Sequence, residues 1–216
     1  MAKIQTNPKG WKFVGGRLCL DFLNTVGGRV RSATVLRDKL VDYYDLLDWS
    51  RLAGLANQAE SRRLARRAAS QGRDAAATLA RAVLLREALY RIFTSALDGR
   101  RPREADLSTL SRELRIARAH ERLAHKGGAF RWAWEDAGAE LDRILWPVSR
   151  SAADLLTSVD LSRIRRCAGH ECGWLFLDTS RNRSRHWCDM KDCGNRAKVR
   201  RFRKRQERSG GQVSAV

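Results

Sequence analysis

The chain has 216 residues, of which 43% are hydrophobic, so it is long enough and apolar enough for one folded domain with a small additional module. Its formal net charge of +19 indicates a polyanionic partner, and nucleic acid is a commoner one than an anionic membrane surface. No apolar run approaches the roughly 20 residues of a membrane span, and residues 1–10 lack the apolar stretch of a signal peptide, so we expect a cytoplasmic protein without a membrane partner.

The composition favours a mainly α-helical fold, because the chain has only three prolines and is rich in Ala, Leu and Arg. Near the N-terminus, a turn at Gly15 and Gly16 precedes a short strand or helix around Leu18, Leu20 and Phe22. Apolar residues at helical spacing then predict five helices. Their expected ranges are Asp42 to near Gly54, residues 57–70, Asp74 (as the N-cap) to Gly99, residues 106–119 and residues 138–157.

A β-hairpin is predicted between the last two of these helices, where Gly127 and Gly128 separate the alternating stretches 122–125 and 129–134. Pro147 interrupts the fifth helix, so we expect either a kink there or a helix boundary displaced by one turn. The expected division is a helical domain over residues 1–158, a cysteine-containing module over 159–208 and a disordered tail over 209–216.

Four of the five cysteines form two close pairs, Cys167 with Cys172 and Cys188 with Cys193. Four residues separate the members of each pair, and fifteen separate the two pairs. Two such pairs joined by a short loop are typical of tetrahedral Zn²⁺ held by four thiolates. Disulfides are the alternative, but a cytoplasmic protein keeps its thiols reduced. A complete shell of four thiolates leaves no position for water or substrate, so we expect one structural zinc ion.

Two histidines lie close to these cysteines and are alternative ligands. We expect His170 and His186 instead to be surface or phosphate-facing side chains, because four cysteines already complete the shell. Trp174, Phe176 and Trp187 are expected to cover the metal site or to dock on the helical domain.

Positive charge is concentrated around the cysteines. Residues 160–216 contain 15 Lys/Arg and 6 Asp/Glu, a net of +9, whereas the first 159 residues contain 28 and 18, a net of +10. Residues 196–205 include seven cations around Ala197, Val199 and Phe202. We expect a helix over residues 195–208 that starts just after Cys193. In isolation this helix would repel itself, so a polyanion is the expected neighbour.

The stretch 179–186 combines hydroxyl, amide and guanidinium groups, which suit phosphate oxygens, although a solvated turn has the same composition. Arg196 and Arg200 are candidates for contacts to guanine edges in the major groove. The residues expected to contact duplex DNA are Arg181, Arg183, Arg185, His186, Arg196, Lys198, Arg200, Arg201, Arg203, Lys204 and Arg205.

The helical domain has one candidate ligand site, formed by Asp21, Asn24 and Thr25 within an otherwise apolar stretch. The alternative is that these side chains cap the following helix and satisfy local backbone groups. Cys19 is expected to be a core residue, with redox sensing as its alternative. Three tryptophans could line an aromatic pocket, although core packing or a dimer face is the favoured interpretation: Trp132, Trp134 and Trp146. The histidines form no catalytic set with a nucleophile, so no enzymatic activity is expected.

The tetrad Cys193-Gly194-Asn195-Arg196, with the stretches WLFLDTSRNRSRHWC and CGNRAKVRRFRKR, resembles the bacterial CGNR zinc-finger family. The upstream stretch RLCLDFLNT resembles the mostly helical ABATE domain that usually precedes this finger. The resemblance covers nearly the whole chain and is specific at its two ends. For the finger, the resemblance implies a treble-clef-like fold, in which a zinc knuckle is followed by a hairpin and then a helix, and a DNA-binding role. For the whole chain, it implies a candidate stress-induced transcription regulator.

These observations predict a zinc-dependent DNA-binding transcription regulator, whose helical domain senses a small-molecule effector or forms a homodimer. The alternative is an RNA- or ribosome-associated zinc module, which competition between duplex DNA and structured RNA would distinguish. A third hypothesis is an enzyme with a zinc-stabilised accessory domain, which would require a pocket with strongly perturbed titratable groups.

Overall fold

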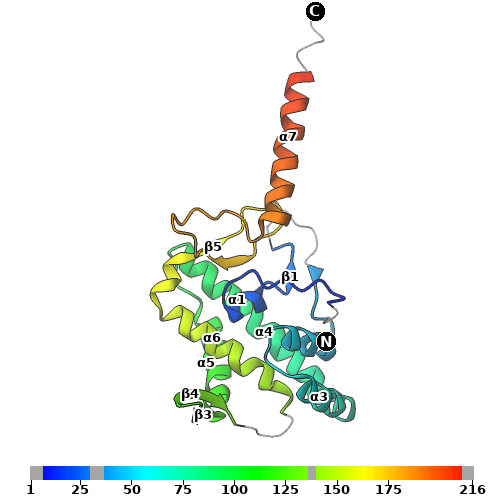
Figure 1. The fold of residues 1–216 in the computed structure, drawn as a ribbon, viewed down its shortest axis with the longest axis vertical. Coiled ribbons are helices and arrows are strands. Elements are labelled where there is room, and N and C mark those ends of the chain that lie inside the picture. Colours follow the sequence, from blue (N-terminus) through cyan, green and yellow to red (C-terminus); the bar gives the residue numbers. More distant parts are fainter. Residues whose placement is uncertain (1–6, 30–36, 136–139, 211–216) are drawn as a thin grey trace, which may run out of the picture.

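The computed structural model describes residues 7–29, 37–135 and 140–210, and it shows a mainly helical molecule (Figure 1). The helical body contains α1 (Leu18–Leu23), α2 (Tyr43–Leu52), α3 (Gln58–Ser70), α4 (Gly72–Leu97), α5 (Glu104–Ala119) and α6 (Leu145–Leu156). The short 3₁₀ turns are η1 (Leu141–Ile144) and η2 (Val159–Arg163). The C-terminal helix α7 (Asn195–Gly210) follows a π-helical turn, η3 (Met190–Gly194), and projects from the body.

The described residues form three two-stranded antiparallel sheets. These are β1 (Val26–Gly27) with β2 (Arg37–Asp38), β3 (Glu121–Lys126) with β4 (Ala129–Trp134), and β5 (Ile164–Arg166) with β6 (Leu175–Leu177). In the part of the chain that the structure covers, no helix is both long and apolar enough to cross a membrane.

The hydrophobic core surrounds α4, which packs against α1, α2, α3, α5 and α6. Small and apolar residues on one side of α4 make this close packing possible, among them Ala75, Ala82, Leu85, Leu89, Ile92 and Phe93. The same core cluster includes Ile164, Leu175 and Leu177 from the β5–β6 sheet. The helical body and the C-terminal module therefore bury one continuous apolar surface.

The predicted starts of α2 and α3 are confirmed by their capping geometry. Asp42 accepts a hydrogen bond from Asp45 N at 2.9 Å, and Asn57 accepts one from Glu60 N at 3.0 Å. The carboxylates at the third helical positions bond back to the cap backbone, which completes a capping box in each case. The predicted start of α4 at Asp74 was wrong, because α4 begins at Gly72 and Asp74 lies in its first turn.

The start of α5 also differs from the prediction. The helix begins at Glu104, and Asp106 is buried in its first turn, where Arg91 and Arg103 donate hydrogen bonds to its carboxylate. Pro147 marks a displaced boundary and not a kink: the α-helix starts at Leu145, so Pro147 lies in the first turn, where its missing N–H is tolerated. The predicted start of this helix at residue 138 lies outside the described residues.

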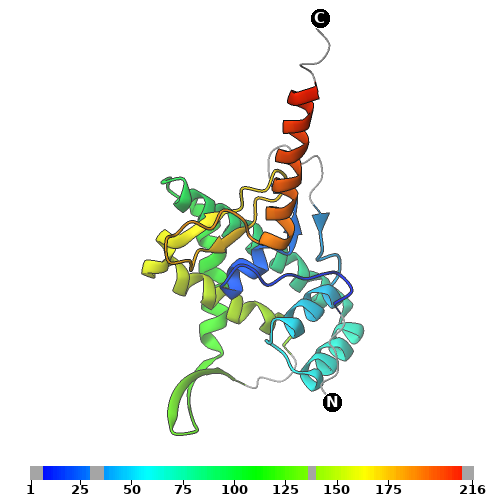
Figure 2. The ribbon, with the colours of Figure 1, turned by 45° about the horizontal axis from the view of Figure 1, so that its top comes forward.

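The predicted hairpin is confirmed as β3 and β4, and Figure 2 shows it extending from the end of the body opposite to α7. One face of the hairpin places Leu123 opposite Trp132 and His125 opposite Phe130. Leu123, Phe130 and Trp132 are 58%, 73% and 62% exposed, so most of this apolar face is open to solvent.

Candidate metal centre and nucleic-acid interface

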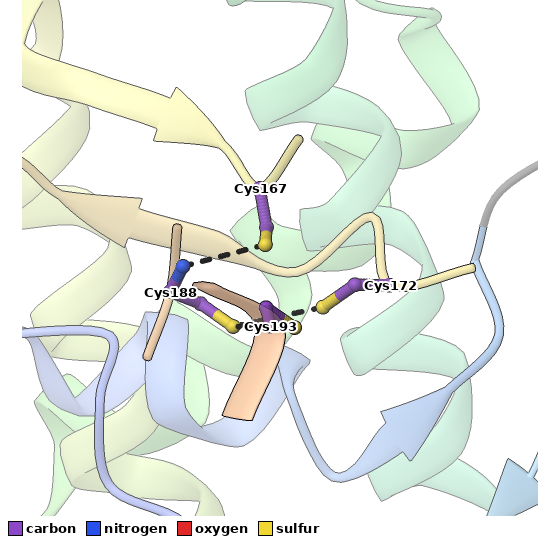
Figure 3. Close-up of side chains that lie close together, drawn as sticks. All are labelled: Cys167, Cys172, Cys188 and Cys193. Carbon is purple, nitrogen blue, oxygen red and sulfur yellow. Dashed lines mark hydrogen bonds between the residues drawn. The ribbon is translucent and has the colours of Figure 1, made fainter. Parts of the chain in front are cut away.

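The two cysteine pairs converge at the junction of the β5–β6 sheet and α7 (Figure 3). Cys167 directly follows β5, and Cys172 precedes β6 on the other side of the same tight connection. The Cys167 N–H donates to Trp174 O at 2.8 Å, which closes this connection. Cys188 ends the long loop after β6, and Cys193 lies in η3 immediately before α7. The strands thus flank the first cysteine pair, whereas the resemblance implied a hairpin between the knuckle and the helix.

The four Sγ atoms lie close enough together to hold one metal ion. All lie within 4.8 Å of one another, with Cys172 Sγ 3.6 Å and Cys193 Sγ 3.7 Å from Cys188 Sγ. Zn–S bonds of about 2.3 Å in tetrahedral geometry place the sulfurs about 3.8 Å apart. A disulfide would require about 2.05 Å, and all four cysteines are free. The cluster therefore fits one zinc ion and excludes the disulfide alternative in this structure.

Neighbouring backbone and one side chain donate hydrogen bonds to the sulfurs, as thiolates require. The N–H groups of Gly169 and Cys188 lie 3.4 and 3.3 Å from Cys167 Sγ, and Arg196 Nη2 lies 3.3 Å from Cys193 Sγ. A Cβ at Gly169 would lie 3.1 Å from Cys193 Sγ and 3.0 Å from the Cys172 Cβ. A side chain at position 169 would therefore push these cysteines apart by a few tenths of an ångström. Four thiolates complete the coordination shell, which is the arrangement of a structural zinc site.

The two histidines lie outside this shell. His170 and His186 are exposed, and within the described part of the chain the side chains grouped closely enough to hold a metal ion are the four cysteines. The aromatic residues cover the site as predicted: Phe176 is buried against the cysteines, and Trp174 and Trp187 pack beside them.

The zinc site is attached to the helical body by hydrogen bonds as well as by the shared core. Asn24, in the turn after α1, donates to Leu175 O at 2.9 Å and accepts from Leu175 N at 3.1 Å. Trp174 Nε1 donates to Val26 O at 2.7 Å, and Tyr90 of α4 donates to Gly173 O at 2.9 Å. The position of the metal-binding connection is therefore set directly by α1, α4 and β1.

The proposed ligand-binding trio makes internal hydrogen bonds. Asp21 accepts from Gly15 N at 2.7 Å, and burial raises the pKa of its carboxyl to about 6. Thr25 donates to Phe22 O at 2.8 Å and accepts from Arg86 at 3.2 Å. The contacts of Asp21 with Gly15 and of Thr25 with Phe22 are local, as the alternative expected, whereas Asn24 bonds the distant Leu175. Ligand sensing by the trio stays a prediction. Cys19 is fully buried, which raises the pKa of its thiol to about 12, as expected of a core residue.

Replacing Asn24 by alanine is expected to lower the free energy of unfolding by about 2–4 kcal/mol, because the buried N–H and C=O of Leu175 both lose a partner. Denaturant unfolding of the zinc-loaded protein measures the change. Asn182→Ala is the control, since Asn182 is exposed in the same module. Equal unfolding free energies for the two variants would contradict a connecting role for Asn24.

A cavity of about 580 Å³ lies between the β3–β4 hairpin and α6. Its lining residues are Arg17, Glu121, Trp132, Trp134, Pro147, Arg150, Ser151, Asp154, Leu155 and Ser158. Trp146 is not among them: it is buried, and His120 stacks on its ring at a centroid distance of 3.9 Å. The predicted group of three tryptophans is therefore divided between a cavity wall and the protein interior.

Asp178, which sequence reasoning missed, organises the loop between the cysteine pairs. It is fully buried and accepts hydrogen bonds from Ser180 N at 2.9 Å, Ser180 Oγ at 2.5 Å and Arg185 N at 3.1 Å. The Ser180 hydroxyl lowers the pKa of the Asp178 carboxyl, which keeps it ionised as an acceptor. The resulting turn leaves Arg181 and Arg183 exposed.

Two of the arginines predicted to contact DNA, Arg185 and Arg196, also make contacts within the protein. Arg185 donates to Trp187 O at 3.0 Å and Val14 O at 3.2 Å, and its guanidinium lies 4.3 Å from the Phe176 ring centroid. Arg196 bonds Cys193 Sγ and forms an ion pair with Asp192 at 3.1 Å. The hydrogen bond with Cys193 raises the pKa of the Arg196 guanidinium. Both side chains brace the zinc site in this structure.

The other predicted contact residues are exposed around the metal centre. Arg181, Arg183 and His186 lie on the loop, and α7 carries the remaining cations on its exposed surface: Lys198, Arg200, Arg201, Arg203, Lys204 and Arg205. Helix α7 leaves the body directly from Cys193, so the zinc site fixes its first turn (Figures 1 and 3).

Fold and site together define a helical domain joined to a four-cysteine zinc finger with a basic C-terminal helix. Residues 16–159 match the ABATE family model, described as "Putative stress-induced transcription regulator", and residues 163–206 match the CGNR zinc finger. The chain belongs to the ABATE family and carries a CGNR zinc finger. Neither description is that of an enzyme family. No curated protein sequence matches the chain.

Proposed function

We propose that this protein is a transcription regulator that binds duplex DNA through its zinc finger and α7. The observation that carries the proposal is the exposure of a helix with seven cations in ten residues, held at its start by the metal site. An α-helix has a diameter of about 10–12 Å, which suits a major groove about 12 Å wide. The role of zinc in this proposal is to fix the direction in which α7 leaves the body.

The proposed phosphate contacts come from the exposed cations. Arg185 and Arg196 are excluded from this set because their guanidinium groups brace the zinc site. Phosphate contacts are independent of base sequence, so these side chains supply affinity and orientation. The proposed set is Arg181, Arg183, His186, Lys198, Arg200, Arg201, Arg203, Lys204 and Arg205.

The helical domain is proposed to supply the regulatory input, by dimerisation or by binding a small effector. The open apolar face of the β3–β4 hairpin favours dimerisation, and the cavity beside it favours a ligand. Trp132 contributes to both surfaces. If either role holds, Trp132→Ser should change the sedimentation coefficient or the effector response while leaving the zinc content at one per chain.

Competition between nucleic acids separates DNA binding from the RNA-associated alternative. A labelled duplex of random sequence is bound to the zinc-loaded protein and then challenged with equal nucleotide concentrations of unlabelled duplex DNA or structured RNA. The proposal predicts that duplex DNA displaces the label at lower concentration. If structured RNA is the better competitor against every duplex tested, the protein is an RNA-binding module.

A further inference from the structure

Helix α7 has an uncharged stripe along an otherwise basic surface. Successive helical residues advance by about 100°, so Asn195, Val199, Phe202 and Gln206 fall within a sector of about 60°. The cations occupy the rest of the circumference from Arg196 to Arg205. Arg203 lies beside the stripe on one side, and Lys198 and Arg205 lie beside it on the other.

The stripe is not packed against the body. Val199 is 51% exposed and Phe202 is 62% exposed, and every residue from Lys198 to Glu207 is exposed. Asn195 lies at the first turn, where its amide donates to Lys191 O at 3.1 Å. Val199, Phe202 and Gln206 therefore form the part of the stripe that extends beyond the zinc site, where α7 stands clear of the other elements (Figure 2).

We propose that this stripe faces the base edges in the major groove and selects A·T base pairs, an inference that rests on the proposed binding of duplex DNA. The Gln206 amide matches the adjacent donor and acceptor at N6 and N7 of adenine, and Val199 and Phe202 match the C5 methyl groups of thymine. From Asn195 to Gln206 the helix rises about 16 Å, which corresponds to about five base pairs.

Charge complementarity identifies duplex DNA as the occupant of this face. Cations on both sides of the stripe would meet the two phosphate backbones that border the groove, while the uncharged side chains reach its floor. A second copy of α7 would bring the same cations against each other. A membrane surface would gain only two large apolar side chains, Val199 and Phe202. Arg196 and Arg200, which the sequence suggested for guanine contacts, lie outside the stripe.

The test starts with selection of bound sequences from a random duplex library by the full-length, zinc-loaded protein. The expected site contains a core of about five base pairs rich in A·T. Replacing a contacted dT by dU removes its methyl group and should weaken wild-type binding roughly fourfold, the effect of losing one methyl-sized apolar contact. Phe202→Ala should abolish that difference for the methyl group that Phe202 contacts. Gln206→Ala should reduce the preference for adenine at one position by between about fivefold and about 150-fold.

Arg203→Ala is the matched control, because Arg203 lies beside the stripe and is proposed to contact phosphate, so its replacement should weaken binding to all duplexes equally. Alanine favours helix at each position, so these exposed substitutions keep α7 folded. Salt-dependent binding without base preference, or selection of G·C-rich sites, would overturn the proposal that the stripe selects A·T base pairs. The proposed binding of duplex DNA would still stand. Failure to bind any duplex would overturn both proposals, and binding only to anionic phospholipid vesicles would assign the stripe to a membrane.

Discussion

Cys172→Ser is expected to release zinc and to unfold the C-terminal module. Serine replaces one of the four thiolates whose sulfurs lie within 4.8 Å of one another, so the tetrahedral shell loses a corner. Structural zinc of this kind contributes on the order of 10–16 kcal/mol of apparent binding free energy at neutral pH. This binding free energy is at least comparable with the free energy of unfolding of a whole domain, which is about 5–15 kcal/mol. Elemental analysis of purified protein measures the zinc content directly.

Cys19→Ser is the control for this experiment. Cys19 is fully buried in the helical body and lies outside the cysteine cluster, so its replacement should leave one zinc per chain. Retention of a full zinc equivalent by Cys172→Ser would contradict the four-thiolate site. Loss of zinc from Cys19→Ser with an otherwise folded helical body would also contradict it.

Replacing Arg200, Arg201, Arg203 and Lys204 together by alanine is expected to weaken binding to every duplex and to reduce its salt dependence. If about six cations of the wild-type protein neutralise phosphates, log K should fall with log salt at a slope near −5. Each lost phosphate contact changes this slope by about 0.9, so the slope of the fourfold variant should be smaller in magnitude by about 0.9 for each replaced side chain that contacts a phosphate, and by about 3–4 units if all four do. Titrations at several salt concentrations measure both quantities.

A matched variant tests whether position or net charge matters. Arg62, Arg66, Arg73 and Arg101 are exposed on the helical domain, so their replacement by alanine removes the same charge away from α7. That variant should keep nearly the wild-type slope, because long-range charge is screened within about 10 Å at 0.1 M salt. Both variants must retain zinc. Equal slopes for the α7 variant and the wild-type protein would show that α7 is not the DNA-contacting element.

The sequence predicted the features that depend on local chemistry. Asp42 and Asn57 start helices because a side-chain acceptor three residues before a backbone N–H is a local arrangement. Gly127 and Gly128 both have positive φ, 62° and 77°, which explains why this pair marked the hairpin turn. The spacing of Cys167, Cys172, Cys188 and Cys193 likewise predicted the metal site, since each pair lies on one short connection.

The features that depend on distant partners were not predictable from periodicity. Asn24 bonds Leu175, 151 residues away, and no local pattern distinguishes this role from a ligand contact. The same holds for Arg185 and Arg196, whose local composition favours DNA contact, but whose guanidinium groups bond Val14 O and Cys193 Sγ. The start of α4 was misplaced because Asp74 is equally favourable as an N-cap and as an acidic residue in the first turn.

The C-terminal tail, residues 209–216, was predicted to be disordered. Helix α7 continues through Gly210, so the predicted disorder from residue 209 starts too early, and residues 211–216 lie outside the described part of the chain.

One measurement tests most directly the claim that zinc holds a DNA-binding helix in place. The affinity of the wild-type protein for a duplex is titrated at several salt concentrations, first with zinc bound and then after zinc is removed by a chelator and the chelator is dialysed away. The account predicts tight binding with a slope near −5 for the zinc-loaded protein, weaker binding without zinc, and recovery when zinc is restored. Unchanged affinity and slope after zinc removal, or no binding to any duplex with zinc bound, would contradict it.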